Sequence, residues 1–249
     1  MILPIVALSF YSLFIILILY GLFLYKKPII KKSLEKKIGL SVIVAVRNGE
    51  KSLPNLLACL SNQKYQGPFE IIIVDDKSED NTASIIKKYA ATDSRFRFET
   101  SEMGSEELKQ KKRALDAGIK ISRYNNLLFT DVDCMITTDW IKNMASYFVS
   151  GYDYLVGYTY IDNNNSTDYV TLFQGIDLLM MMIVGKAFFG LGKPFGAIGQ
   201  NQGFTKKLYE SAGGFKSINS FVGDDTAFLQ HCKKFNPKVG FVAIPNLYI

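Results

Sequence analysis

One stretch decides the expected fold class of this 249-residue chain: Asn126-Leu127-Leu128-Phe129-Thr130-Asp131-Val132-Asp133. A short apolar run that leads directly into acids is typical of a strand buried on both faces of a sheet. Alternate residues of an extended chain point the same way, so Asp131 and Asp133 are expected to share one side. Mg²⁺ takes one or two such carboxylates together with phosphate and water oxygens. We therefore expect a metal–diphosphate site at the end of a central strand. The alternative is an Asp-rich turn that caps the next helix.

Short apolar runs alternate with longer amphipathic stretches on both sides of this strand. The expected strands are 40–46, 69–74, 95–99, 126–133 and 152–160, and the expected helices are 51–63, 81–91, 106–121 and 139–149. Alternation at this length predicts parallel pairing through right-handed crossovers. The expected fold class is therefore α/β, with a mostly parallel sheet and helices on both faces.

The first 25 residues carry no charged side chain and consist mostly of Leu, Ile, Phe and Val. About 20 such residues cross the hydrocarbon core of a bilayer. A cleaved signal peptide would begin with a basic segment and have a shorter apolar core. Here Lys26 and Lys27 follow the apolar run directly. This pattern favours a retained transmembrane anchor over 1–25, with the rest of the chain in the cytoplasm.

Most of the net charge of +6 lies in the segment 26–39, which holds six lysines and one glutamate. Such a juxtamembrane linker attracts anionic lipids, and it does not predict nucleic-acid binding. Cys59, Cys134 and Cys232 are odd in number and widely spaced, which predicts unpaired thiols in a reducing compartment. Cys134 is expected to pack beneath the acid pair, and Trp140 and the single His231 are expected to be structural.

The segment 170–195 is strongly apolar but is interrupted by glycines and by three charged residues. We expect a pair of helices that lies on the body or at the membrane interface, more than a second full span. An ordinary buried core helix is an equally weighted alternative.

Two further acid pairs occur in the chain, one at the end of an expected strand and one at the start of an expected helix. Asp75-Asp76 closes the strand 69–74, where carboxylates can accept hydrogen bonds from a ribose or a base. Asp224-Asp225 begins a stretch of helical character, and a helix N-terminus favours an ionised carboxylate. An ionised carboxylate in a site can accept a proton from an attacking hydroxyl. Simple capping of a helix is the alternative for both pairs.

The three acid pairs, in this order and at these separations, resemble family 2 glycosyltransferases, which are inverting enzymes with the GT-A fold. Further matches are Ala45 to Glu50, Gln110 to Asp116, Gly199 to Phe204 and Ala212 to Phe215, and the resemblance covers roughly residues 40–235. The chain departs from the family pattern at Asp224, Gln110 and Asp116, where Glu, Gly and Asn are usual. The domain is expected over 40–249, and the absence of the family's Q-x-x-R-W segment is what a C-terminally truncated chain or a shorter type would show.

The resemblance implies roles for individual residues. The nucleotide sugar would be bound by Arg47, Asn48, Asp75, Asp76, Lys111 and Asp131. The metal ion, Mg²⁺ or Mn²⁺, would be held by Asp131 and Asp133. The acceptor side would be formed by Asn201, Gln202 and Gly203, and the catalytic residues would be Asp225 and Asp224. Asp225 would act as the general base.

The expected function is metal-dependent, inverting sugar transfer at the cytoplasmic membrane face. The donor would be a nucleotide sugar, with a UDP-sugar favoured, and the acceptor a lipid or a polysaccharide. Two alternatives are a nucleotidyltransferase, which would release pyrophosphate, and a catalytically silent membrane scaffold.

Overall fold

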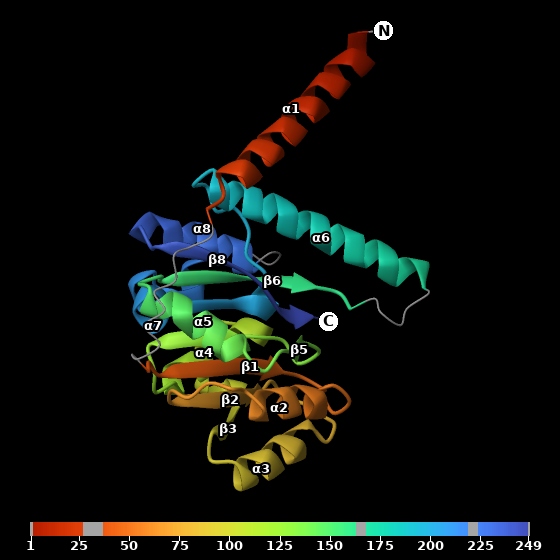
Figure 1. Ribbon diagram of the computed structural model, residues 1–249. Coiled ribbons are helices and arrows are strands. Elements are labelled where there is room, and N and C mark those ends of the chain that lie inside the picture. Colours follow the sequence, from red (N-terminus) through yellow and green to blue (C-terminus); the bar gives the residue numbers. More distant parts are fainter. Residues whose placement is uncertain (1, 27–36, 163–167, 219–223, 249) are drawn as a thin grey trace.

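The computed structural model describes residues 2–26, 37–162, 168–218 and 224–248 (Figure 1). Within these ranges one eight-stranded sheet has the order β3-β2-β1-β4-β7-β6-β8-β5. The strands are β1 (Leu40–Val46), β2 (Phe69–Asp75), β3 (Phe96–Thr100), β4 (Asn126–Phe129), β5 (Met135–Ile136), β6 (Tyr154–Tyr160), β7 (Gln202–Thr205) and β8 (Val239–Tyr248).

The helices flank this sheet and precede it. They are α1 (Ile2–Leu24), α2 (Leu53–Ser61), α3 (Thr82–Thr92), α4 (Gln110–Ile121), α5 (Trp140–Val149), α6 (Tyr169–Gly190), α7 (Lys206–Ser211) and α8 (Asp224–Cys232), with short 3-10 turns η1 (Ser101–Met103), η2 (Gly199–Asn201), η3 (Gly214–Ser217) and η4 (Lys233–Phe235). Every strand and helix expected between residues 40 and 160 is present, with ends shifted by up to four residues. Most of the basic linker, residues 27–36, lies outside the described residues.

The sheet is parallel around β1 and mixed beyond β4. β1 pairs in parallel with β2 and β4, and β2 pairs in parallel with β3. β7 runs antiparallel to both β4 and β6, while β6 and β8 are again parallel. The α/β prediction is confirmed, but β5, β7 and β8 were not predicted from the sequence. The reversal at β7 places Gln202 opposite Phe129, at the point where β4 ends.

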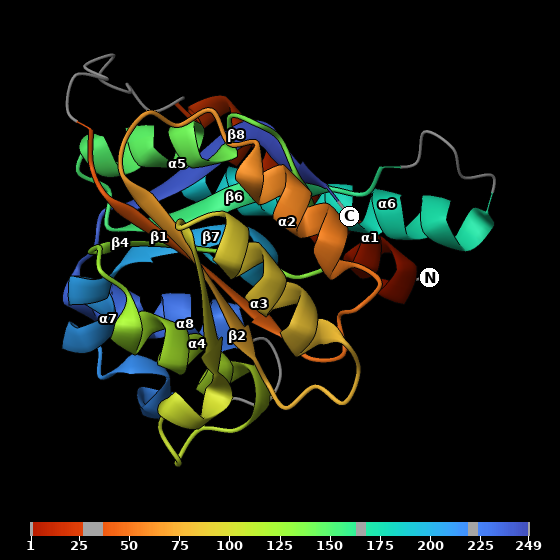
Figure 2. The same cartoon turned by 90° about the horizontal axis from the view of Figure 1, so that it is seen from below.

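The sheet separates two apolar cores. Along β1, Val42, Val44 and Val46 join one buried cluster, whereas Ile43 joins the other, as the two-residue period of a strand requires. Figure 2 shows α2 and α3 on one face and α4, α7 and α8 on the other. Helices on both faces, as predicted, therefore give every central strand a buried environment.

The apolar segment after residue 168 is one continuous helix, α6, and the predicted helix pair is wrong. Gly185 lies inside the helix with no atom near the position of an added Cβ, so it neither packs closely nor breaks the backbone. Three α6 residues, Leu178, Met182 and Ala187, are buried, whereas Phe173 and Met180 are among its exposed side chains. α1 and α6 are both long and apolar enough to cross a membrane by length and composition alone.

α1 leaves the body at a steep angle and touches it only near its C-terminal end (Figure 1). Gly21 of α1 lies against the backbone of Ala187, and Gly190 of α6 lies against the carbonyl oxygen of Gly21. A Cβ at Gly21 or Gly190 would overlap the facing backbone. Small residues thus permit the close crossing of these two helices, as they do in membrane helix pairs.

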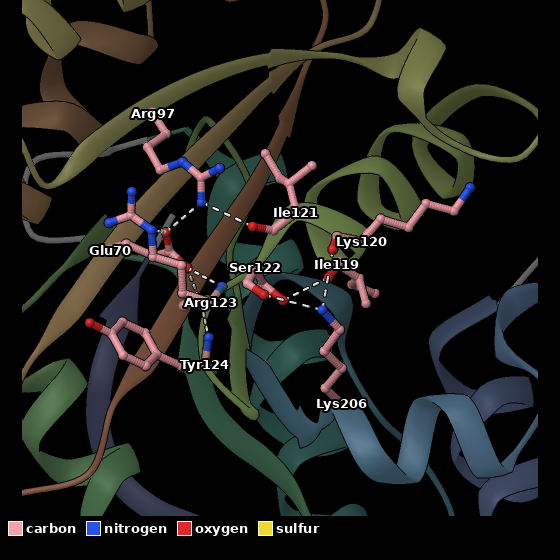
Figure 3. A network of polar contacts seen from close by, with 10 residues as sticks. Glu70, Arg97, Ile119, Lys120, Ile121, Ser122, Arg123, Tyr124 and Lys206 are labelled. Atoms are coloured by element: carbon pink, nitrogen blue, oxygen red, sulfur yellow. Dashed lines mark hydrogen bonds and ion pairs between the residues drawn. The ribbon is translucent and has the colours of Figure 1, made fainter.

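A buried carboxylate anchors the N-terminal edge of the sheet (Figure 3). Glu70 on β2 is 2% exposed and accepts hydrogen bonds from Ser41 Oγ at 2.7 Å and from the backbone N–H of Arg123 at 2.6 Å. It also pairs with Arg97 Nη1 at 2.6 Å, and Arg97 donates to the carbonyl of Ile121 at the end of α4. One carboxylate therefore ties together β1, β2, β3 and the segment that enters β4.

Replacing Glu70 with Gln should lower the free energy of unfolding by about 2 kcal/mol, because the Arg97 guanidinium would lose its charged partner. For a chain of this size that corresponds to roughly 4–8 °C in Tm, measured on the full chain in neutral detergent. Glu106→Gln removes the same charge at an exposed position and should leave Tm within about 1 °C. Equal Tm values for the two variants would contradict this account of Glu70.

Candidate active site

Two of the predicted acid pairs follow β2 and β4, the parallel strands on either side of β1, and the third pair begins α8. Asp75 is the last residue of β2 and is 7% exposed, and its Oδ1 has no hydrogen-bond partner among the described residues. Asp76 is partly exposed and its backbone N–H bonds to the carbonyl of Val46 at 2.7 Å. A buried carboxylate oxygen without a partner at a strand end is suited to a ligand that carries hydrogen-bond donors.

The loop after β1 is fixed to the loop after β2. Asn48 has a left-handed backbone with φ 51°, which Asn tolerates better than most residues. Its backbone N–H bonds to Ser78 Oγ at 2.9 Å, and its side-chain oxygen accepts from the N–H of Glu79 at 2.9 Å. Arg47 is exposed beside this joint. Asn48 therefore shapes the loop, and Arg47 lies exposed directly after β1.

Asp131 and Asp133 lie in a turn, not on an extended strand. β4 ends at Phe129, and the N–H of Cys134 bonds to the carbonyl of Asp131 at 3.3 Å. The predicted alternation of the two carboxylates is therefore wrong, because pairing with β1 stops at the Ile43–Phe129 position. The turn leaves Asp133 exposed and points Asp131 toward α4.

Lys111 connects the acid turn with the third acid pair. Its ammonium lies 2.6 Å from Asp131 Oδ1. Burial lowers the pKa of Lys111, but the carboxylates of Asp131 and, after it, Asp225 outweigh burial and raise the pKa overall. Residues from α4, the turn after β4 and α8 thus share one electrostatic environment, although they are far apart in the sequence.

Asp225 is held in the first turn of α8 by residues from the sheet. Gln202 Nε2 donates to Asp225 Oδ1 at 2.8 Å, and the hydroxyl of Tyr154 donates to Gln202 Oε1 at 2.7 Å. A Cβ at Gly199 would overlap the Asp225 carboxylate, so η2 also packs directly against it. Burial raises the pKa of Asp225, and Lys111 and the Gln202 hydrogen bond oppose that rise. The carboxylate is therefore both fixed in place and more basic than an ordinary aspartate.

Asp224, the residue before it, pairs with Lys112 of α4 at 3.0 Å. Two consecutive lysines of α4 thus contact two different acid pairs: Lys111 contacts the pair after β4 and Lys112 contacts the pair that begins α8. Gly223, which completes the third motif in the sequence, lies outside the described residues.

Residues 201–203 do not line an open mouth in this structure. Asn201 is 1% exposed, accepts from Trp140 Nε1 at 3.0 Å and donates to the carbonyl of Tyr158 at 2.9 Å. Gln202 is 2% exposed, and its side-chain amide accepts a hydrogen bond from Tyr154 and donates one to Asp225. Gly203 packs against the carbonyl of Leu127 on β4. All three support the site from beneath.

The residues expected to be structural are confirmed as such. Trp140 is fully buried, and His231 Nε2 contacts the carbonyl oxygen of Ala212 at 3.0 Å. Burial raises the pKa of the Cys134 thiol to about 12, so this group is not a nucleophile at neutral pH. Cys59, Cys134 and Cys232 are all unpaired.

Tyr154, Gly199 and Lys112 were not predicted as parts of the site, and Gln202 was expected on the acceptor side. Nothing in a single sequence marks a tyrosine in an apolar strand as a partner of a glutamine 48 residues later. Only the antiparallel pairing of β7 between β4 and β6 brings these groups together.

The carboxylates fit a hard divalent cation by their chemistry. Asp131 and Asp133 offer carboxylate oxygens from one turn, and Mg²⁺ typically uses one or two protein carboxylates and completes its shell with phosphate and water. Among the described residues no group of three or more His, Cys, Asp or Glu could hold a metal by itself. Lys111 already satisfies Asp131 Oδ1, so a divalent cation would compete with this ammonium.

A model of the family described as Glycosyl transferase family 2 matches residues 41–213. The chain belongs to this family. Chondroitin synthase of Pasteurella multocida (strain Pm70) is 29% identical over 144 residues, which cover 57% of this chain and 14% of that protein. Poly-beta-1,6-N-acetyl-D-glucosamine synthase of Staphylococcus epidermidis is 30% identical over 126 residues, which cover 49% of this chain and 29% of the synthase. The family 2 chain thus matches less than a third of either relative's length.

Solved structures show that this family member has the GT-A fold. A mannosyltransferase from Pyrobaculum calidifontis, solved with GDP-Man and Mn²⁺, superposes with a TM-score of 0.67 at 17% identity over 93% of this chain and 62% of its own. Residues 1–349 of S. aureus TarS, solved with UDP-GlcNAc, superpose with a TM-score of 0.58 at 21% identity, covering 85% of this chain and 58% of TarS 1–349.

Replacing Lys111 with Met should tighten the binding of Mn²⁺ alone by about three- to tenfold, because the ammonium no longer competes for Asp131. The free Mn²⁺ signal in electron paramagnetic resonance, recorded without nucleotide, measures this affinity. Lys109→Met removes a charge two residues earlier, at an exposed position just before α4, and should change the affinity less than twofold. Weaker Mn²⁺ binding by Lys111→Met would refute the competition.

Proposed function

We propose that this chain is the catalytic unit of a metal-dependent, inverting glycosyltransferase that uses a nucleotide sugar at the cytoplasmic face of a membrane. The observation that carries the proposal is the joint environment of Asp225, Lys111 and Asp131, which come from three separate segments. One of the three is a fixed carboxylate of raised pKa, and the others form a charge pair suited to phosphate and metal. The family relatives and the GT-A fold support the same reaction class.

The donor would lie across the ends of β2, β1 and β4. The unpartnered Asp75 oxygen and the neighbouring Asp76 would accept hydrogen bonds from ribose or base, with Arg47 at the rim. Lys111 would move from Asp131 toward the diphosphate. Asp131 and Asp133 would hold Mg²⁺ or Mn²⁺, which when bound neutralises charge on the departing nucleoside diphosphate.

Asp225 would remove the proton from the acceptor hydroxyl as its oxygen attacks the anomeric carbon. Gln202 keeps one carboxylate oxygen of Asp225 occupied at 2.8 Å, which leaves the other to receive the proton. A single attack from the face opposite the leaving group inverts the configuration. Asp224, which forms an ion pair with Lys112, would hold the start of α8 against α4. This contact would fix the position of Asp225 relative to the sheet.

The favoured donor is a UDP-sugar, and the favoured acceptor is a lipid or a growing polysaccharide, because α1 would anchor the domain to the bilayer. The structural neighbours are known with GDP-Man and with UDP-GlcNAc, so both nucleotides belong in a donor screen. The synthase relatives support a polysaccharide product.

Asp133→Ala and Asp225→Asn should separate metal binding from chemistry. Asp225→Asn should bind UDP with Mn²⁺ within about twofold of wild type by calorimetry, yet transfer sugar about 10²–10⁴-fold more slowly. Asp133→Ala should lose at least about tenfold in nucleotide affinity and most of the transfer. Asp139→Asn serves as the control. Asp139 is a nearby acid in the sequence that pairs with Lys142, and its replacement should leave nucleotide binding and sugar transfer as in wild type.

Product analysis decides among the alternatives. Release of nucleoside diphosphate supports sugar transfer, and release of pyrophosphate would establish a nucleotidyltransferase instead. Sugar transfer that survives in both Asp133→Ala and Asp225→Asn would refute the assigned roles. A wild-type chain that binds no nucleotide with Mn²⁺ would favour the silent scaffold.

The raised pKa of Asp225 predicts a pH dependence of known sign. A general base works only when it is deprotonated, so kcat/KM should fall as the pH drops through the Asp225 pKa, which burial places above the usual value for Asp. Gln202→Leu removes a hydrogen bond that lowers this pKa. The acidic limb of the profile of kcat/KM against pH should therefore move to higher pH, by about one unit.

Tyr154→Phe is the matched control for that measurement. It removes the hydroxyl bonded to Gln202 but keeps the bond from Gln202 to Asp225, so the acidic limb should move much less. If Gln202→Leu slows the reaction without moving the limb, Gln202 has only a packing role.

A further inference from the structure

A crevice of about 270 Å³ lies where the end of α1 meets α6 and the start of β8. It is lined by Leu24, Tyr25, Lys26, Tyr152, Phe189, Gly190, Val239, Gly240 and Phe241. β6 and β8 run parallel to each other and in the same direction as β1, through the two reversals at β7. The crevice is therefore at the N-terminal edge of the sheet, opposite the strand ends that carry the acid pairs.

The depth of the crevice relative to a bilayer follows from α1. A helix of 23 residues is about 34 Å long, close to the roughly 30 Å thickness of the hydrocarbon core. Leu8, Phe10 and Leu19 of α1 are among its many exposed apolar side chains, as lipid contact requires. If α1 spans the membrane, Tyr25 and Lys26, which follow its last residue directly, lie where the hydrocarbon gives way to headgroups.

Three lysines surround the crevice. Lys26 is part of the lining and is exposed. Lys186 Nζ lies 5.0 Å from the ring centroid of Tyr25, and Lys238 Nζ lies 4.1 Å from that of Tyr152. The described lining residues include no acid. Asp153 lies beside Lys238, but its carboxylate accepts the backbone N–H of that residue at 2.9 Å.

The floor of the crevice is aromatic and fixed in place. The hydroxyl of Tyr25 donates to the carbonyl of Phe241 at 3.1 Å, and the rings of Tyr25 and Phe189 both pack on the Phe241 ring. The contact between Gly21 and Gly190 holds α1 and α6 together beside it. A pocket with an apolar floor and a cationic rim matches a molecule with an anionic head and an apolar body.

We propose that this crevice binds the phosphate headgroup of an anionic lipid of the cytoplasmic leaflet, with Lys26, Lys186 and Lys238 around the phosphate. The inference rests on the proposed membrane location of the chain. Basic pockets beside membrane helices at the cytoplasmic side recognise phosphate headgroups in this way. A lipid bound here would brace the body against the foot of α1 while leaving the opposite edge of the sheet open for donor and acceptor.

The test uses the full chain, purified in neutral detergent, and thermal unfolding as the readout. Dioctanoyl phosphatidylglycerol should raise Tm in a saturable manner, and dioctanoyl phosphatidylcholine should not. Lys26→Gln/Lys186→Gln/Lys238→Gln should weaken the apparent affinity for phosphatidylglycerol about tenfold or more. Lys64→Gln/Lys87→Gln/Lys88→Gln is the matched control, because it removes the same charge from the α2–α3 side and also breaks one lysine–ring contact, Lys87 with Phe98.

Retained affinity in the crevice variant, or equal loss in the control, would overturn the proposal, because the binding would then be non-specific. Equal stabilisation by inorganic phosphate alone, or by phosphatidylcholine, would also overturn it. The shift in Tm caused by UDP with Mn²⁺ is recorded on the same samples. Its presence in the crevice variant shows an intact body, and its absence in wild type counts against the proposed enzyme without altering the lipid result.

Discussion

The Lys111 ammonium is the interaction on which the site depends, because it lies among carboxylates that repel one another. Its contact with Asp131 at 2.6 Å, and its weaker attraction to Asp225, offset the repulsion between these two acids in a partly buried space. α4 places this lysine there by packing under β1 and β2, with Ala114, Ala117 and Ile119 buried in the second core. The packing of α4 on the sheet thus determines where the positive charge of Lys111 lies among the carboxylates of the site.

The reversal of the sheet at β7 supplies the second requirement, which is a fixed position for Asp225. Parallel strands alone would bring the acids after β2 and β4 together, since both follow the same edge. α8 comes much later in the chain and needs its own support. Gln202, placed beside Phe129 by the antiparallel β4–β7 pairing, provides that support with a single hydrogen bond.

Much of the fold could be predicted from the sequence, because its parallel half consists of strands with strong apolar runs between amphipathic helices. The acid pairs were also recognisable as a set. β7 and β8 were not, since Gln202 to Thr205 has no strand-like alternation and its pairing depends on partners far away in the chain. The turn at Asp131 and the continuous helix α6 escaped for a related reason: three-dimensional context decided both, against the local pattern.

The roles of Asn201 and Gln202 show the limit of reasoning from motifs. A motif can mark a segment as part of a site, but it does not say whether a side chain faces the ligand or the core. Asn201 is only 1% exposed and Gln202 only 2%, so both side chains face the core. Their amides therefore support the strand ends.

The chain contains a single tryptophan, and its place next to this support has a practical value. The indole N–H of Trp140 bonds to Asn201, the residue directly before Gln202, in a fully buried setting. Its fluorescence is therefore an intrinsic optical reporter of the segment that carries the Asp225 support. Ligand-linked motion of that segment can be followed by emission wavelength and quenching, without attaching a dye.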